Sequence, residues 1–546
     1  MRRLVYLIAA IALLVPAAAQ PAFAQQQPQD LTINALQGEP DNIDPNRSSF
    51  ATEAAVIRQA FQPLLRFDSR LTPQPAAAQS YDVSPDGLVY TFHLRPDGRW
   101  SDGQPVTAQN FEYSWKRILD PQIAAEYASF FVDSGIVGAD DWNSGKVPSA
   151  DGVGVRALDD LTLEIRLTHP FGPLPDLAAL WVVSPIRQDI VQANPTGWTQ
   201  DPSTYVGNGP FMMTEWVHQD HISFVPNPNY TANGMWPVPT LQRVTFLMVT
   251  NGEADYAAYL NGERDWTLTP DSVVNVVLQD PDLSQQARQY NELTVFWAHI
   301  NNTKQPLNDV RVRRALAKAI DRTALIRDIA SGVGLPATSI IPPGMPGFVE
   351  GLGQELAFDP QGAQELLAEA GFPGGAGFPK LTYSFATTSA NQRRAEFLQA
   401  QWKQNLNIDV QLNSMESKAY QAAFKDKNYE LAFGGWGADY PDPQDWFNTL
   451  FGCKGGNNKY NYCNPTFDQL VSTADNGVDL SDRIVLYNQA QTVLIQDAPV
   501  APLFVRGRMV LVKPYVQMTD GSPLTITGQD DYPGDYFLDM VRITPH

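Results

Sequence analysis

Several short stretches of the chain alternate between apolar and polar residues with a period of two, which is typical of a β-strand with one buried face. Residues 161–167 alternate directly after the turn residues Asp159 and Asp160, and residues 90–94 alternate just before a turn at 96–98. We therefore predict a strand in each place, with every second side chain facing a core.

Other stretches have helical spacing. Thr107 stands where an N-cap is preferred, and the apolar residues after it fall on one helical face. That face contains Phe111, Trp115, Ile118 and Leu119. Asp359 and Pro360 begin a second predicted helix, with the cap and the first-turn proline in their preferred places, and Gly371 ends it.

A third helix is predicted to begin near Asn308. Its buried face would contain Val312, Ala315, Leu316, Ala319 and Ile320. Its cationic residues, which we expect to face solvent, are Arg311, Arg313, Arg314 and Lys318. Because strands and helices interleave, and because the chain has no repeat, the pattern indicates an α/β fold with mixed sheets.

The first 24 residues have the pattern of a secretory signal peptide. Arg2 and Arg3 give a positive start, residues 4–15 an apolar run, and residues 22–24 a cleavage site of the small-x-small type. The run is too short to span a bilayer, and no cysteine follows the cleavage site to carry a lipid. We expect export to the periplasm as a soluble protein that is not a lipoprotein.

The chain is acidic, with 59 acidic and 38 basic side chains and a formal net charge of −21. Such a charge repels nucleic acid and anionic membranes and favours encounter with cations, so we expect no nucleic-acid partner. The simpler interpretation is an acidic surface that only keeps the protein soluble. The length of 546 residues predicts three or four domains.

Cys453 and Cys463 are the two cysteines, and a turn-prone run lies between them. In an oxidising compartment we predict a local disulfide, worth roughly 3 kcal/mol through loop entropy. A catalytic thiol is the alternative, although no histidine lies near in sequence.

Residues suited to metal binding or catalysis are sparse. His218 and His221 lie in a strand-like stretch, 212–225, where positions i and i+3 face opposite sides. The sequence has no zinc-type Cys/His set and no phosphate-binding Gly-Lys-Ser loop, so we predict neither a metal nor a cofactor. Asp133 lies in an Asp-Ser-Gly turn that resembles the active-site turn of aspartic proteases, but those enzymes need two such turns. We predict a protein that is not an enzyme.

In residues 435–443 (GWGADYPDP), Asp439 stands between glycines and aromatics, and Asp442 follows among prolines. Glycines let another backbone approach, aromatic rings exclude water, and an acid in such a wall is costly unless it meets a positive partner. The segment therefore suits the cationic end of a ligand. The alternative is a solvated acid on a proline-rich loop.

Eight stretches in order along the mature chain together resemble one family, the extracytoplasmic peptide-binding proteins of ABC importers, in its oligopeptide-binding branch. They are 94–103 (LRPDGRWSDG), 111–117 (FEYSWKR), 207–211 (GNGPF), 300–302 (INN), 308–313 (NDVRVR), 321–322 (DR), 366–371 (LLAEAG) and 436–440 (WGADY).

The resemblance implies a three-lobed fold like that of type II periplasmic binding proteins, with mixed sheets and an extra inserted domain. Lobe I would comprise residues 25–58, 190–292 and 509–546, lobe II residues 59–189, and lobe III residues 293–508. The ligand would be enclosed between lobes I and III, where closure excludes water and strengthens polar contacts.

The resemblance also implies how a peptide would bind. Asp439 would pair with the α-amino group, Tyr127 of lobe II would face the ligand, and Trp436 would wall a side-chain pocket. The backbone would run alongside the peptide at Gly435 and Gly437 on one side and from Ser49 to Ala51 on the other.

The chain departs from the family where the peptide carboxylate is met. Well-studied oligopeptide binders have basic residues where Phe424 and Phe433 stand and a histidine where Gln392 stands. We still expect Phe433 and Gln392 to lie at the ligand, but neither supplies a positive charge. The cysteine pair is not in the family's usual place either.

The resemblance thus implies a monomeric periplasmic receptor for short peptides that delivers them to ABC permease and ATPase subunits. A receptor of the same fold for a modified cell-wall peptide, a nickel chelate, haem or an oligosaccharide is the alternative. A secreted peptidase using Asp133 is a remote one.

Overall fold

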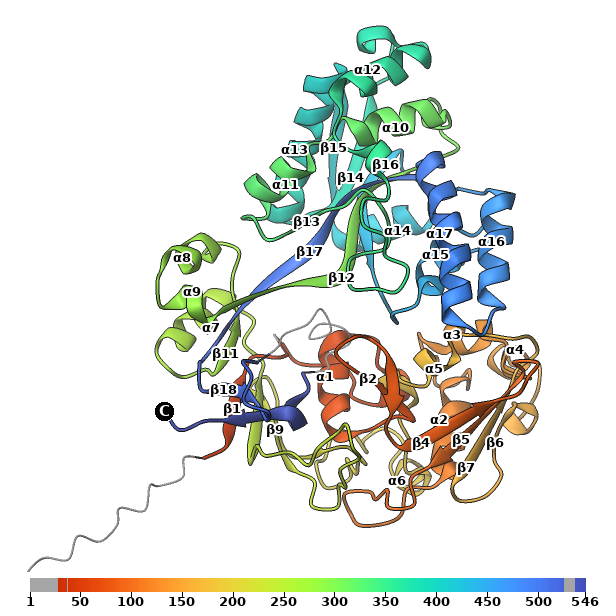
Figure 1. Cartoon of the computed structure of the whole chain (residues 1–546), viewed down its shortest axis with the longest axis vertical. Coiled ribbons are helices and arrows are strands. Elements are labelled where there is room, and N and C mark those ends of the chain that lie inside the picture. The colour runs from red at the N-terminus through yellow and green to blue at the C-terminus, as the bar shows by residue number, and fades with distance from the viewer. Residues whose placement is uncertain (1–27, 37, 525–535) are drawn as a thin grey trace, which may run out of the picture.

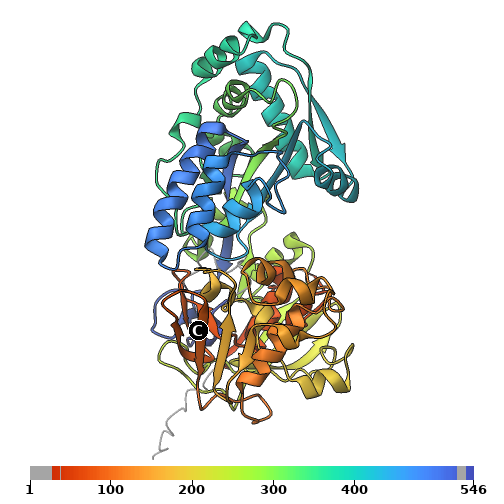
Figure 2. The ribbon, with the colours of Figure 1, turned by 90° about the vertical axis from the view of Figure 1, so that its right-hand side faces the viewer.

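The computed structural model describes residues 28–36, 38–524 and 536–546. It has two parts, a lower body and an upper lobe, joined by two long antiparallel strands, β12 (Ala287–Ile300) and β17 (Val500–Val512) (Figure 1). Figure 2 shows the same two parts one above the other from the side. We use the name lobe III for the upper lobe, and within the body the name lobe II for residues 59–189 and lobe I for the rest.

An 11-stranded sheet runs through both parts because β12 and β17 belong to each of them. In the order in which they pair, its strands are β15 (Val410–Met415), β14 (Leu381–Ala386), β16 (Leu431–Gly437), β12, β17, β11 (Trp266–Leu268), β1 (Asp30–Ile33), β10 (Arg243–Leu247), β9 (His221–Pro226) and β8 (Phe211–Val217). Strand β13 (Gly334–Pro336) also pairs with β17. The sheet mixes parallel and antiparallel pairs, so the predicted α/β class with mixed sheets is confirmed.

Lobe III has a hydrophobic core on each face of its sheet, since alternate residues of β12 face opposite sides. One core lies under α10 (Val310–Lys318), α11 (Arg322–Ile329), α12 (Pro360–Glu369) and α13 (Ser389–Leu406). The other lies under α15 (Pro443–Phe451), α16 (Pro465–Asp475) and α17 (Leu480–Asp497). Helix α14 (Ser417–Lys425) packs beside β14.

The body contains a four-stranded antiparallel sheet in lobe II and the strands of lobe I. The lobe II sheet comprises β4 (Ala78–Val83), β5 (Val89–Leu94), β7 (Thr162–Arg166) and β6 (Val155–Ala157). The remaining strands are β2 (Leu65–Phe67), β3 (Pro73–Pro75), β18 (Val516–Met518) and β19 (Val541–Ile543). The α-helices are α1 (Ala51–Ala60), α2 (Ala108–Ile118), α3 (Ala128–Asp133), α4 (Ala139–Asn143), α5 (Leu174–Leu177), α6 (Gln188–Ala193), α7 (Gly252–Leu260), α8 (Val274–Gln279) and α9 (Leu283–Gln286).

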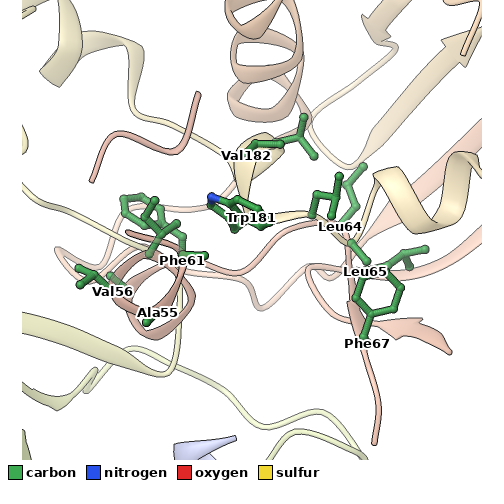
Figure 3. Close-up of a cluster of buried hydrophobic side chains, with 14 of the residues drawn as sticks. Ala55, Val56, Phe61, Leu64, Leu65, Phe67, Trp181 and Val182 are labelled. Atoms are coloured by element: carbon green, nitrogen blue, oxygen red, sulfur yellow. The ribbon is translucent and has the colours of Figure 1, made fainter. Parts of the chain in front are cut away.

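Lobes I and II share one hydrophobic core. Figure 3 shows Val56 and Phe61, from α1 and its C-terminal end, beside Trp181 and Val182 of the short helix η3 (Trp181–Val183). The predicted boundary near residue 59 thus crosses a common core, whereas the predicted boundaries at 293 and 508 fall inside β12 and β17. Relative movement is therefore easier between the body and lobe III than within the body.

The elements predicted from periodicity are present. Strands β5 and β7 and helices α2, α10 and α12 begin and end within a few residues of their predicted bounds, and the predicted apolar faces are buried. The prediction that all four cations of α10 face solvent is wrong for Arg313, which is buried and donates to the carbonyls of Leu307 and Asp497. The guanidinium thereby satisfies carbonyls at the C-terminal end of α17 and in the segment before α10.

Among the described residues, no helix is long and apolar enough to cross a membrane. The predicted signal peptide, residues 1–24, lies outside the described residues. Stretch 212–225 is a hairpin of β8 and β9 rather than a single strand, with His218 in its turn.

Candidate functional site

One edge of β16 has no strand partner over most of its length. Strand β12 pairs with β16 from Leu431 to Gly437, but β14 pairs with it only at Leu431 and Ala432. Beyond that point β14 pairs only with β15, so the backbone of residues 434–437 faces no strand on that side among the described residues. Such an edge accepts an extended chain as an added strand.

Asp439 lies two residues beyond this open edge. The Tyr127 hydroxyl, from the N-terminal end of α3 in lobe II, donates to its Oδ1 at 2.8 Å. The Tyr127 ring is fixed edge-on against Trp181, with centroids 5.2 Å apart. Burial raises the pKa of Asp439 to about 6, and the Tyr127 hydrogen bond opposes that rise. The site therefore holds a carboxylate that is ionised at neutral pH and supported by a single side-chain donor.

A second acid, Asp445, lies beside Asp439. Its Oδ2 accepts from the Asp439 backbone N–H at 2.9 Å and from the Trp436 indole at 3.0 Å. Its Oδ1 is buried and has no hydrogen-bond partner among the residues that the structure describes. Burial, together with the charge of Asp439, raises the pKa of Asp445 well above its usual range. Burial and the neighbouring charge of Asp439 therefore both favour the neutral form of Asp445.

The start of α15 holds both acids in place. Asp442 caps the helix by accepting from the Gln444 N–H, and it forms a buried two-bond ion pair with Arg483 of α17, at 2.7 and 2.8 Å. Pro443 occupies the first helical turn. Because Asp445 belongs to the same turn, its position relative to Asp439 is set by this cap and ion pair.

The two glycines of β16 differ in what they permit. A Cβ on Gly435 would lie 2.3 Å from the Val295 carbonyl oxygen, so this glycine is required by β12, its own neighbour in the sheet. A Cβ on Gly437 would meet only the Thr294 side chain, at 3.0 Å. The expectation that glycine here admits a ligand backbone therefore rests on Gly437 more than on Gly435.

The lobe I residues expected to line the site lie around the start of α1. Ala51 is its first residue, and the Ser49 N–H already donates to Oε2 of Glu53 at 2.8 Å. Glu53 also accepts from the Phe50 N–H. The Phe50 carbonyl is also engaged, because it accepts from the Glu53 and Ala54 N–H groups at the start of α1. Of these two residues, only Ser49 therefore keeps its carbonyl for an added strand.

The residues at positions that are basic in other oligopeptide binders have partners of their own. Phe433 is buried, Phe424 packs on the ring of His299 with centroids 4.5 Å apart, and Gln392 donates to Glu396 at 2.7 Å. The structure therefore brings Asp439, Trp436, Gly437 and Tyr127 together, whereas Phe433 and Gln392 lie apart from them along β16 and α13.

Cys453 and Cys463 form a disulfide, as predicted. Cys453 also lines a cavity of about 520 Å³ between lobe II and lobe III, together with Asp133 and His169. Asp133 is exposed at the end of α3. Among the described residues no group of three or more His, Cys, Asp or Glu side chains is arranged to hold a metal ion.

Sequence reasoning missed Asp445 and Arg483. The signal for Asp445 was available, because Asp442, Pro443 and Asp445 occupy the cap, first and third positions of a helix start. Arg483 lies 41 residues from Asp442 in the chain and only the fold brings them together.

Comparison with known proteins agrees with this architecture. Bacterial extracellular solute-binding proteins, family 5, match over residues 72–458. The periplasmic oligopeptide-binding protein OppA of Salmonella typhimurium is 33% identical over 506 residues, covering 92% of this chain and 91% of that protein.

Two solved structures are also similar. The periplasmic murein tripeptide binding protein MppA, in its unliganded open form, has a TM-score of 0.81 at 29% identity, covering 95% of this chain and 98% of that one. Haemophilus influenzae OppA in complex with RPPGFSPFR has a TM-score of 0.73 at 28% identity, covering 95% and 100%. The fold is that of the type II periplasmic binding proteins, and the present structure is more similar to the open form. The chain belongs to family 5 of the bacterial extracellular solute-binding proteins.

Proposed function

We propose that this protein is a receptor that captures short peptides and delivers them to an ABC transporter. The observation that carries the proposal is the open edge of β16, which leads into a part-buried carboxylate, Asp439, hydrogen-bonded by Tyr127 of another lobe. A peptide added to this edge gains backbone hydrogen bonds whatever its side chains are, and its ammonium group meets Asp439. Relatives named as oligopeptide- and murein tripeptide-binding proteins support the ligand class.

Closure of lobe III onto the body would enclose the peptide between β16 and residues 49–51 of lobe I. The Trp436 indole, held by Asp445, would then wall the first side-chain pocket. Water in the pockets farther along the strand would let different side chains be accepted.

We also propose that the protein is exported and works together with the subunits of an importer. Residues 1–24 would be removed as a signal peptide, leaving a periplasmic monomer without a lipid anchor. Its partners would be the permease and ATPase subunits of an importer. The protein itself would catalyse no reaction.

A thermal-shift screen tests the ligand class. We expect di- to pentapeptides to raise the melting temperature by several degrees, and oligosaccharides, nickel chelates and haem to leave it unchanged. Murein peptides belong in the same screen because a modified peptide also offers an ammonium and a backbone. If only a sugar, chelate or haem stabilises the protein, a receptor for that ligand replaces the peptide receptor.

Native mass spectrometry of freshly purified protein complements the screen, since a closed receptor retains ligand. Incubating a bound peptide with the protein also tests the remote peptidase alternative. We expect the peptide mass to stay unchanged, whereas cleavage products that disappear in an Asp133→Asn variant would establish an enzyme.

A further inference from the structure

The other end of the open edge of β16 carries an aromatic layer. Phe433 of β16, Phe296 of β12 and Phe504 of β17 come from three neighbouring strands. The Phe296 ring stacks on Phe433 with centroids 5.3 Å apart and on Phe504 with centroids 5.0 Å apart. This layer lies where β16 parts from β14 and its free edge begins.

Arg394 of α13 lies over this layer. Its guanidinium carbon is 5.6 Å from the ring centroid of Phe433 and 5.6 Å from that of Phe504. The one hydrogen bond that the structure gives this guanidinium goes to Oδ1 of Asn391, at 3.1 Å, and none of the described carboxylates lies within ion-pair distance of it. Aromatic faces hold a guanidinium in place without neutralising it. Arg394 is therefore a fixed, half-buried cation with donors to spare.

The surroundings of Arg394 are basic although the whole chain carries a net charge of −21. Arg506 lies over the Phe296 ring at 5.9 Å, and it shares the buried acid Glu292 with Arg508. Burial lowers the pKa of Arg394, as do Arg393 and Arg506, while Asp271 acts in the opposite direction. A local excess of arginine in an acidic protein attracts anions.

The spacing fits a peptide. Phe433 precedes Asp439 by six residues, so an extended backbone spans at most about 20 Å between them, the length of about six peptide residues. With its ammonium at Asp439, a peptide would have to run antiparallel to β16 for its carboxyl end to approach Phe433.

We propose that Arg394 binds the α-carboxylate of the peptide. The inference rests on the proposed function and supplies the cation that Phe424, Phe433 and Gln392 do not. The charge comes from α13, two residues after Gln392, and reaches across the Phe433 ring. A guanidinium suits this role because it donates two parallel hydrogen bonds to a carboxylate.

The test uses alanine peptides of two to six residues, each made as a free acid and as a C-terminal amide, titrated calorimetrically into the full-length mature protein. We expect wild type to bind at least one length about tenfold more tightly as the acid. Arg394→Gln should weaken binding of that acid about tenfold and leave the amide within about twofold. Arg327→Gln removes the same charge from an exposed arginine of α11 in the same lobe and should keep the wild-type ratio.

Arg394→Lys keeps the charge but loses the paired donors, so it should retain a reduced preference for the acid. The same titrations can be made with Arg394→Lys alone if Arg394→Gln does not fold. Unchanged acid-to-amide ratios in both Arg394 variants would overturn the inference, as would an equal loss for acid and amide, which would mean that Arg394 acts through folding or closure. If wild type binds none of these peptides, the proposed function itself fails and this inference with it.

Discussion

The two ends of the open strand edge are built in different ways. At one end, Asp439 of lobe III lies beside Asp445 and accepts a hydrogen bond from Tyr127 of lobe II, so the site combines groups from two lobes. At the other end, Arg394 lies on aromatic rings that all belong to lobe III. The geometry of the acidic end thus depends on the relative position of the lobes, whereas all the residues of the basic end belong to one lobe.

The opposite charges of the two ends would also orient the ligand. Opposite charges at the two ends favour one direction of a zwitterionic chain, because the reverse direction would bring like charges together. The two ends can be tested separately, since a change at Asp439 should affect ligands through their amino groups and a change at Arg394 through their carboxylates.

The largest effect is expected at the acidic end. Asp439→Asn should weaken binding of a free peptide by about 3–5 kcal/mol, because it leaves an unmatched ammonium in an enclosed site. Calorimetry measures the loss. Asp426→Asn, which removes an exposed acid of the same lobe, is the matched control and should bind like wild type. Near-wild-type affinity in Asp439→Asn would remove Asp439 from its role.

Removing the disulfide should lower the stability of the protein without changing its ligand affinity. Replacing Cys453 and Cys463 together by serine should lower the free energy of unfolding by about 3 kcal/mol, since the loop between them is no longer closed in the unfolded chain. Ligand affinity at a temperature where the variant is folded should stay within about twofold. Denaturant unfolding with and without peptide measures both quantities, and a large affinity loss in folded protein would mean that the loop shapes the site.

Lowering the pH should weaken the acidic end selectively. With the Asp439 pKa at about 6, the empty site takes up a proton below that pH and the ligand must displace it. Affinity for a free peptide should therefore fall about tenfold per unit below pH 6, or about 1.4 kcal/mol per unit. The basic end should not respond in this range because arginine stays charged. Asp439→Asn should abolish this slope, and a slope that persists in the variant would assign it to another group.

The raised pKa of Asp439 also makes the stability of the ligand-free protein depend on pH. Because the folded value of about 6 exceeds the ordinary value of 3.8, the folded state binds this proton more tightly than the unfolded state. The contribution of Asp439 to the free energy of unfolding is therefore fully present below pH 3.8 and is lost as the pH rises through 6.

The smallest effect is expected from Tyr127→Phe. The variant loses the hydroxyl that donates to Asp439, which should cost about 1 kcal/mol of peptide affinity. Because that donor stabilises the carboxylate, the pKa of Asp439 should also rise, and the pH dependence should shift upward. Calorimetry across pH 5–8 measures both changes, and a pH profile that coincides with wild type would show that Tyr127 does not act on Asp439.

Periodicity predicted the local elements well, because the apolar residues that α2, α10 and α12 bury lie within one short segment each and recur with helical spacing. It failed for Arg313, because the position of Arg313 in its helix gives no sign that its guanidinium donates to the Asp497 carbonyl at the end of α17. The glycine and aromatic neighbours of Asp439 mark it as a candidate in the sequence, but its role at the ligand is implied by the resemblance to the family and stays a prediction. Arg394 could not be identified as a candidate from the sequence, because Phe433 and Phe504 are distant from it in the chain. They contact Arg394 only because the order of strands in the sheet places them side by side.

The most direct test compares free trialanine with N-acetyl-trialanine binding to the wild-type protein by calorimetry at pH 7.5. The two ligands share backbone and carboxylate, and only one carries an ammonium group. We expect the free peptide to bind at least about 100-fold more tightly. Equal affinities would contradict the account, because the carboxylate of Asp439 would then contribute nothing to capture.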